Sequence, residues 1–193
     1  MKKYLALFIA ILITSGVVMS CKKKATQTES TDNIQANTRM LSLDETIGQY
    51  LTDSIGSRYS EGEVCIPVVT IIDLDSTDVA DIKAWGDYWV FNYNVSGDTL
   101  KTVSGGNHPG MFHLRKTLNG FEVTAFDQVE DGSAFMPSAK RIYGDKFDAF
   151  LATNSDENKR DELRKAAIAH FVKQNSMPVT LYQDYGWPAK EIE

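Results

Sequence analysis

Two of the chain's three histidines lie close together in the stretch SGGNHPGMFHL, residues 104–114. Imidazole is a common group in acid–base catalysis and a common metal ligand, so His108 and His113 raise both possibilities. Zinc, however, takes three or four ligands in motifs such as H-x-x-x-H, and no cysteine lies near these histidines. We therefore expect no metal site, and we interpret the glycines and the proline as a chain reversal that places His108 in a turn.

Other reactive groups lack the surroundings that their chemistry needs. The chain has no G-x-S-x-G nucleophile elbow. Cys65 lies in the apolar run VCIPVVTII, which favours a small core residue over an activated thiol. The acidic run DLDSTDVAD at residues 73–81 lacks the central Gly and the closing Glu of a calcium loop, so we interpret it as a solvated turn. We expect no catalytic residue and no cofactor.

Asp127 is the carboxylate whose expected position most suggests a ligand site. Asn119-Gly120 is a strong hairpin signal, and a two-residue turn there pairs Leu118 with Phe121. The same register pairs Phe112 with Asp127 on the buried face and directs His113 outward. A carboxylate on a core face must be solvated, paired or in a cavity. Asp127 and His113 are therefore candidate ligand-binding residues.

Aromatic side chains supply two further candidates. Trp89, Phe91 and Tyr93 alternate with polar residues, as expected for one face of a strand. Tyr88 and Trp187 adjoin turn residues and fall off the clearest apolar face, so we expect both to be exposed. Exposed aromatic rings stack on sugars or on partner side chains. Tyr88 and Trp187 complete the candidate ligand-binding set.

The elements that must position these residues follow from hydrophobic periodicity. Ser42-Leu-Asp-Glu has the form of a capping box and starts an amphipathic helix that Gly56 would end. Five segments have strand patterns: residues 63–73, with Pro67 indicating an edge or bulge, and residues 85–95, 99–103, 111–118 and 121–129. Two C-terminal helices follow, over residues 138–152, where Gly144 is a possible break, and from residue 155 onward. These patterns predict an α+β domain: a curved antiparallel sheet of about five strands packed on an N-terminal helix, with two C-terminal helices.

This order of elements over residues 41–175 resembles that of the cystatin-like and nuclear-transport-factor-like superfamily. The resemblance implies a strongly bent sheet that wraps a long helix and often encloses a conical pocket. The strings WGDYWVFNYNV, TAFDQVEDGS and YQDYGWP are similar to those of uncharacterised exported lipoproteins of gut-type bacteria. That second resemblance implies a location and no activity.

The N-terminus predicts export and a lipid anchor. A basic start, Met1-Lys-Lys, precedes an apolar run at residues 4–13 that is too short to span a bilayer. It ends in Val18-Met-Ser-Cys21, which resembles a bacterial lipobox. The resemblance implies cleavage before Cys21, acylation of that cysteine and, with Lys22 after it, sorting to the outer membrane of a Gram-negative envelope. An ordinary signal peptide with an incidental cysteine is the alternative.

Composition divides the rest of the chain. Residues 1–20 are the expected signal peptide, residues 21–40 a polar tether that cannot bury enough surface to fold, and residues 41–193 a single domain. Loss of Lys2 and Lys3 with the signal leaves 18 of the 20 basic residues against 26 acidic ones. Such an acidic domain without a basic patch excludes nucleic acid as a partner.

We therefore expect a non-enzymatic binding module for a small ligand, a glycan, a peptide or a partner protein, anchored to the membrane through Cys21. One alternative is a pocket enzyme of the nuclear-transport-factor-like kind that uses Asp127 for acid–base chemistry with His113 or a tyrosine. Another is a structural or inhibitory interaction protein. A closed cavity holding Asp127 and a histidine would favour the enzyme, whereas a filled core with exposed aromatics would favour partner binding.

Overall fold

The computed structural model describes residues 40–59 and 62–192. Residue contacts divide the chain into a unit of residues 1–36 and a second unit of residues 37–193, and every described residue belongs to the second. The expected signal peptide, the expected lipidation site Cys21 and nearly all of the expected tether lie outside the described residues.

The N-terminal helix begins at the predicted capping box. The backbone N–H of Glu45 donates to Ser42 Oγ at 3.2 Å, and the Ser42 N–H donates to Glu45 Oε2 at 2.8 Å. Helix α1 (Leu43–Tyr50) continues through a π-helical turn (Leu51–Ile55) into a short 3-10 turn (Gly56–Arg58). Gly56 therefore does not end the helical segment as predicted, because its backbone keeps the right-handed helical conformation.

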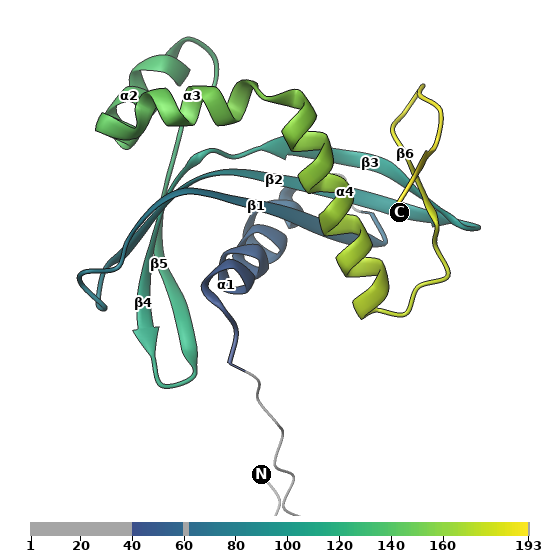
Figure 1. Ribbon diagram of the computed structural model, residues 1–193, viewed down its shortest axis with the longest axis horizontal. Coiled ribbons are helices and arrows are strands. Elements are labelled where there is room, and N and C mark those ends of the chain that lie inside the picture. The colour runs from purple at the N-terminus through teal and green to yellow at the C-terminus, as the bar shows by residue number, and fades with distance from the viewer. Residues whose placement is uncertain (1–39, 60–61, 193) are drawn as a thin grey trace, which may run out of the picture. The chain divides into compact units, whose positions relative to one another are not determined.

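A long two-stranded hairpin forms the centre of the sheet. Strand β1 (Val64–Asp75) pairs with β2 (Ile82–Ser96) along its whole length. On its other side β2 pairs with two strands in turn, β3 (Thr99–Asn107) and β4 (Gly110–Thr117). Each of these extends into a wing: β5 (Gly120–Gln128) pairs with β4, while β6 (Leu181–Gln183) and β7 (Lys190–Glu191) follow β3. The two wings diverge in Figure 1.

The stretch at residues 104–114 is a kink in the sheet and not a chain reversal, so the prediction of a turn is wrong. Both β3 and β4 run antiparallel to β2, which means that the chain keeps its direction through His108 and Pro109. The backbone N–H of His108 still donates to the carbonyl of Tyr88 at 2.7 Å. Pro109 lacks an N–H, which breaks the ladder and lets the chain pass from one wing to the other.

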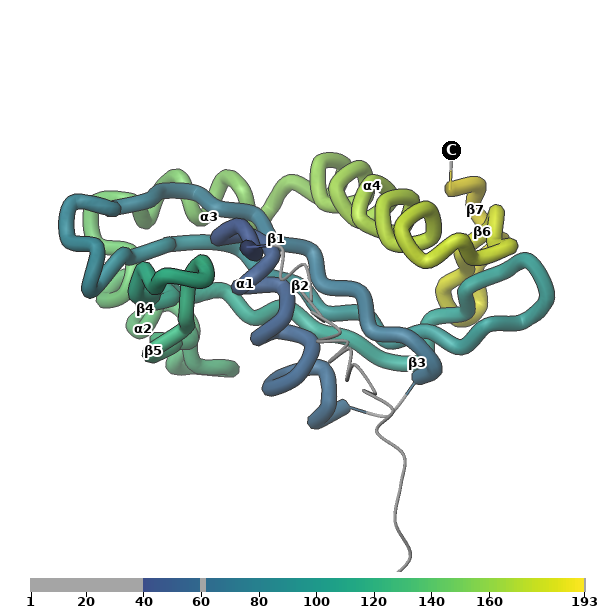
Figure 2. Tube along the Cα trace, turned by 90° about the horizontal axis from the view of Figure 1, so that it is seen from below, coloured from purple at the N-terminus to yellow at the C-terminus, as the bar shows by residue number. Residues whose placement is uncertain are grey.

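Helices cover both faces of the sheet. Helix α1 lies on one face, and α3 (Phe147–Ser155) and α4 (Glu157–Gln174) lie on the other, as Figure 2 shows. Helix α2 (Phe135–Tyr143) packs with α3 against Trp85 and Ile72. Successive residues of β2 serve opposite faces: Tyr88 and Val90 pack with α1, whereas Phe91 and Tyr93 pack with α4. Gly144, with φ of 54°, separates α2 from α3 at the predicted break. The predicted α+β class is confirmed, with seven strands rather than about five.

The β4–β5 hairpin has a different register from the predicted one. Thr117 pairs with Gly120, so the turn is formed by Leu118 and Asn119, one residue earlier than expected. Gly120 supplies the required positive φ of 123°. A bulge after His113 shifts the register again, and Leu118, expected in the core, is 96% exposed.

Candidate functional site

Asp127 and His113 come together, but on the outer surface of the β4–β5 wing. The earlier turn and the bulge together pair Asp127 with Met111 and not with Phe112, so its expected place on the core face is wrong. The Asp127 side chain is 54% exposed, and its Oδ2 lies 3.5 Å from His113 Nε2. The other imidazole nitrogen, Nδ1, lies 2.6 Å from Asp81 Oδ1. His113 does point away from the core, as predicted, and links two solvated carboxylates.

The two aromatic candidates, Tyr88 and Trp187, differ in their exposure to solvent. Tyr88 is fully buried, so its expected exposure is wrong: its hydroxyl donates to the Ala84 carbonyl at 2.9 Å, and burial raises the pKa of its phenol. It is buried because α1 covers the face that a one-sided sheet would leave to solvent. Trp187 is 69% exposed and its neighbour Tyr185 97% exposed, both in the loop between β6 and β7.

His108 is more buried than a turn residue would be. Its Nε2 lies 2.8 Å from the Tyr59 hydroxyl, and its Nδ1 lies 3.0 Å from Gln128 Nε2. Burial lowers the pKa of the His108 imidazole, which favours the neutral form that can accept from Gln128. The residue thus joins the end of the helical segment to both wings at the kink, and its bonds are satisfied within the fold.

A polar cluster that the sequence did not reveal lies under the helices at the bend of β2. Asp87, 4% exposed, accepts from the amides of Asn107 at 2.6 Å and Asn154 at 3.1 Å, and from the Trp89 indole at 3.2 Å. The carboxylate is thereby bonded on both oxygens, and its partners come from β2, β3 and α3. The pocket that Asp87 and Trp89 line has a volume of only about 10 Å³, room for no more than a water molecule. The cluster is structural.

A second unpredicted network attaches α4 to the β3–β6–β7 wing. The Arg164 guanidinium, 7% exposed, forms two hydrogen bonds with the Asp184 carboxylate, at 2.7 and 3.0 Å. It also donates to Thr102 and Tyr93, and it lies 4.0 Å above the Phe91 ring. Arg164 falls within the sequence pattern of an ordinary charged helix, so only its tertiary partners distinguish it.

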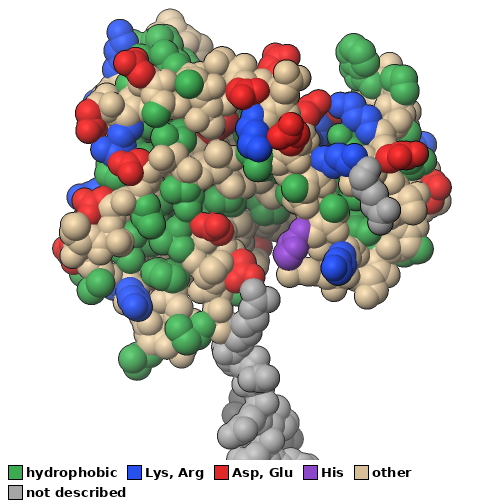
Figure 3. Space-filling model, in the orientation of Figure 1, with side chains coloured by type: hydrophobic (Ala, Val, Ile, Leu, Met, Phe, Trp, Pro, Cys, Tyr) green, Lys and Arg blue, Asp and Glu red, His purple; other side chains and the backbone are tan. Residues whose placement is uncertain are grey.

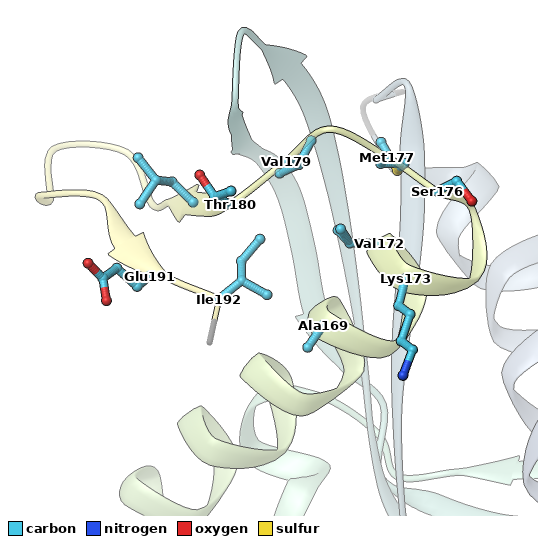
Figure 4. Close-up of a pocket in the computed structure, with 10 residues that line it drawn as sticks. Ala169, Val172, Lys173, Ser176, Met177, Val179, Thr180, Glu191 and Ile192 are labelled. Carbon is cyan, nitrogen blue, oxygen red and sulfur yellow. The ribbon is translucent and has the colours of Figure 1, made fainter.

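A cavity of about 760 Å³ lies between the end of α4 and the C-terminal hairpin (Figure 4). Aliphatic side chains such as Val172, Val179 and Ile192 line it, with Lys173 and Glu191 also among its residues. Backbone N–H groups near it are already used, since those of Thr180 and Ile192 donate within the fold. The cavity offers apolar contact but few free directional groups.

The second large cavity, about 640 Å³, runs along β1 between α1 and α4. We call it the β1 groove, and its walls combine three elements: Asp44, Gly48 and Gln49 from α1, Cys65, Pro67 and Val69 from β1, and Ala167, His170 and Phe171 from α4. Figure 3 shows the hollow, with acidic side chains on the α1 side and a histidine on the α4 side. The ring of Pro67 lies close to Gly48, so the helix approaches the strand tightly at that point.

The β1 groove has an acidic wall and an apolar floor. Asp44 and Glu45 line it on the α1 side, and residues 40–57 contain no Lys or Arg. Cys65, expected in the core, is half-buried at the core's edge and lines the groove, and burial raises the pKa of its thiol, which keeps it protonated. Of these features the sequence revealed only the edge character of β1, through Pro67. The α4 wall lies about a hundred residues further along the chain.

No group of three or more His, Cys, Asp or Glu side chains in the described ranges is arranged to hold a metal ion. None of the helices in this part of the chain is long and apolar enough to cross a membrane. Comparisons with protein-family models, with curated proteins and with solved structures find no match. The β1 groove is therefore proposed as the functional site on its geometry alone.

Proposed function

We propose that this chain is a lipid-anchored envelope protein whose domain is a non-enzymatic module that binds a segment of a partner protein in the β1 groove. The observation that carries the proposal is the groove itself: an apolar strand edge left open between two helices, beside an acidic wall. Exposed apolar surface that is rimmed by polar residues is typical of interaction sites.

The acid–base alternative depends on Asp127 lining a cavity with a histidine. Asp127 is instead half exposed on the outer face of the β4–β5 wing, and the interior beneath it is filled by stacked aromatics, with the Phe112 and Phe126 ring centroids 4.0 Å apart. A filled core favours partner binding over pocket chemistry. An inhibitory or structural role is one form that such partner binding can take.

Site-specific photo-crosslinking in the native envelope tests the groove. A photoreactive residue replaces Gln49 on the α1 wall or Gln174 on the α4 wall of the full-length chain, and Leu118 on the far wing serves as the exposed control. The proposal expects both walls to crosslink to the same short segment of one envelope protein. Absence of crosslinks from both walls, or equal crosslinking from Leu118, would refute it.

The anchor has its own test. Metabolic labelling with palmitate is expected to mark the wild-type chain and not the Cys21→Ala variant, because the Val18-Met-Ser-Cys21 motif resembles a lipobox. Membrane fractionation then asks whether the labelled chain sorts to the outer membrane. Equal labelling of the two chains would refute the proposed lipid anchor at Cys21. The crosslinking experiment would still test the groove.

A further inference from the structure

We propose that the partner segment binds as an added β-strand on β1, and that it alternates basic with apolar side chains. This inference rests on the proposed function and states how the groove recognises its occupant. Strand addition takes its affinity from backbone hydrogen bonds and its specificity from alternate side chains.

The register shows which backbone groups of β1 face the groove. The Tyr88 carbonyl accepts from His108, so Tyr88 directs its backbone toward β3. Because direction alternates along a strand, the neighbouring Trp89 directs its backbone toward β1, where it pairs with Val68. The alternate residues Cys65, Pro67 and Val69 therefore direct their backbone groups away from β2.

Those outward groups have no strand partner in the described part of the chain, where β1 pairs with β2 alone. They offer the N–H groups of Cys65 and Val69 and the carbonyls of all three residues to the groove. Pro67 fits this arrangement, since a proline within a sheet is tolerated where its missing N–H would face outward. The edge is therefore already a template for a further strand.

Charged side chains are confined to the end of β1, at Asp73 and Asp75. Residues 64–72, VCIPVVTII, contain no charged side chain, whereas exposed edges usually carry lysines, inward charges or very short strands. Pro67 and the irregularity between Ile71 and Asp73 are the interruptions. An edge of this length and apolarity is expected to be covered by another strand.

The two walls set the side chains of the added strand. Successive residues of a strand point to opposite faces, so one set of the occupant's side chains meets α1 and the other meets α4. The α1 wall carries Asp44, exposed and on a segment without basic residues, and so favours Lys or Arg. The α4 wall carries Ala167 and Phe171 beside the polar His170 and Gln174 and has no acidic side chain, so it favours apolar over basic side chains.

A bare segment fits this place better than a second copy of the chain. The groove is lined by helices on both faces of the strand, and a second copy would bring its own α1 and α4 to the same positions. Two acidic α1 walls would also repel each other. The occupant is thus an extended polypeptide without helices beside it.

Binding of synthetic peptides to the full chain in detergent micelles tests the inference by fluorescence anisotropy. The probe is a labelled nine-residue peptide that alternates Lys and Val. A block peptide of the same composition and an alternating Glu–Val peptide are each expected to bind at least about tenfold more weakly. Two further peptides carry N-methyl groups, one on all of its lysines and the other on all of its valines. One of them should bind about tenfold more weakly and the other as well as the unmodified peptide, because only alternate residues direct their N–H groups to β1.

A matched pair of variants places the effect on the backbone of β1. Val69→Pro removes an outward N–H as Pro67 already does, and Val69→Ala shortens the side chain but keeps the N–H. We expect Val69→Pro to weaken the alternating peptide about fivefold relative to Val69→Ala. Circular dichroism and thermal unfolding of both variants verify that they fold.

The outcomes separate the inference from the function on which it rests. Equal binding by all peptides, equal binding by both Val69 variants, or no binding of the alternating peptide overturns strand addition, while the crosslinks from Gln49 and Gln174 still judge the groove. A dimer of the chain that disappears in Val69→Pro would also overturn it, because the occupant would be a second copy.

Discussion

The sheet treats two of its edges in opposite ways. The edge at β5 carries Glu122, bonded to Arg115 at 2.6 Å, and the half-exposed Asp127, and β5 itself contains a bulge at Thr124. The edge at β1 carries no charge over residues 64–72 and lies between two helices. Charges and bulges are the usual means of preventing a strand from pairing with another chain.

This difference shows which edge of the sheet is protected against pairing with another chain and which is not. The inner face of β5 is strongly apolar, yet its edge carries charges, so an apolar strand of this sheet can have a protected edge. At β1 the charges and the bulge are confined to the end of the strand, from Ile71 onward, and two walls beside residues 64–70 define a place for one more strand. The contrast, and not the apolarity of β1 alone, is the reason to regard β1 as a binding edge.

The largest expected effect concerns what holds the β5 edge. Phe112 is fully buried, and its ring stacks on Phe126 and contacts Tyr50 and Tyr88 edge-on. Phe112→Ala should lower the free energy of unfolding by about 3–5 kcal/mol, because it removes this ring and leaves a cavity. Urea unfolding measures the loss, and Leu118→Ala in the same hairpin is the control, with an expected change within about 0.5 kcal/mol.

If Phe112→Ala costs no more than Leu118→Ala, the β4–β5 wing is not held by its inner face. The charged edge would then have to contribute to stability, and the comparison between the two edges would fail. The m-value should be unchanged in both variants, since neither alters the surface exposed on unfolding to a large extent.

The next effect concerns α4, one wall of the β1 groove. Arg164→Ala should lower the free energy of unfolding by about 3 kcal/mol, the low end for breaking a buried pair, because Asp184 is itself 32% exposed. Lys190→Ala removes the exposed pair with Asp161 and should change stability by less than about 1 kcal/mol. Binding of the alternating peptide should weaken in Arg164→Ala and not in Lys190→Ala.

The same pair predicts a pH dependence. Burial acts to raise the pKa of the Asp184 carboxyl, but hydrogen bonds from Arg164 and Thr102 outweigh it, so the pKa lies below its usual range. The stabilisation is then present above the unfolded pKa of about 3.9 and is lost as the pH falls through the lower folded value. The difference in unfolding free energy between wild type and Asp184→Asn should therefore shrink below about pH 4. A difference that stays constant down to pH 2 would contradict this assignment.

Local signals predicted some of these regions and failed at others for definite reasons. Ser42 and Glu45 predict the start of α1, and the alternation of Phe91 and Tyr93 predicts one face of β2, because both patterns depend on near neighbours. Tyr88 was misplaced because alternation assumes one solvated face, and here helices cover both. The register of Asp127 was wrong because the turn lies one residue earlier than Asn119-Gly120 indicates, and because the bulge after His113 has no sequence signature.

The candidate site could be predicted only in part. Pro67 indicates an edge strand, and the uncharged run around it is visible in the sequence. That α4 lies over this strand depends on the course of the chain through both wings, and no short-range pattern records it. The Arg164–Asp184 pair that attaches α4 is likewise a tertiary contact.

A variant without the charges of the β5 edge should have the smallest effect on stability, and it tests the comparison between the two edges most directly. Glu122→Val with Asp127→Val deletes two exposed carboxylates, and exposed ion pairs contribute at most about 1 kcal/mol each, so the unfolding free energy should barely change. Self-association, measured by sedimentation velocity, should nevertheless increase, because an apolar edge would now lie open without walls.

The control for that variant is Glu122→Gln with Asp127→Asn, which removes the charge but keeps the edge polar, and it should associate less than the valine pair. If the double valine variant remains as monomeric as wild type, the charges of β5 do not prevent self-association. The absence of charge along residues 64–72 of β1 would then no longer distinguish it as a binding edge, and only the walls of the groove would support the proposal.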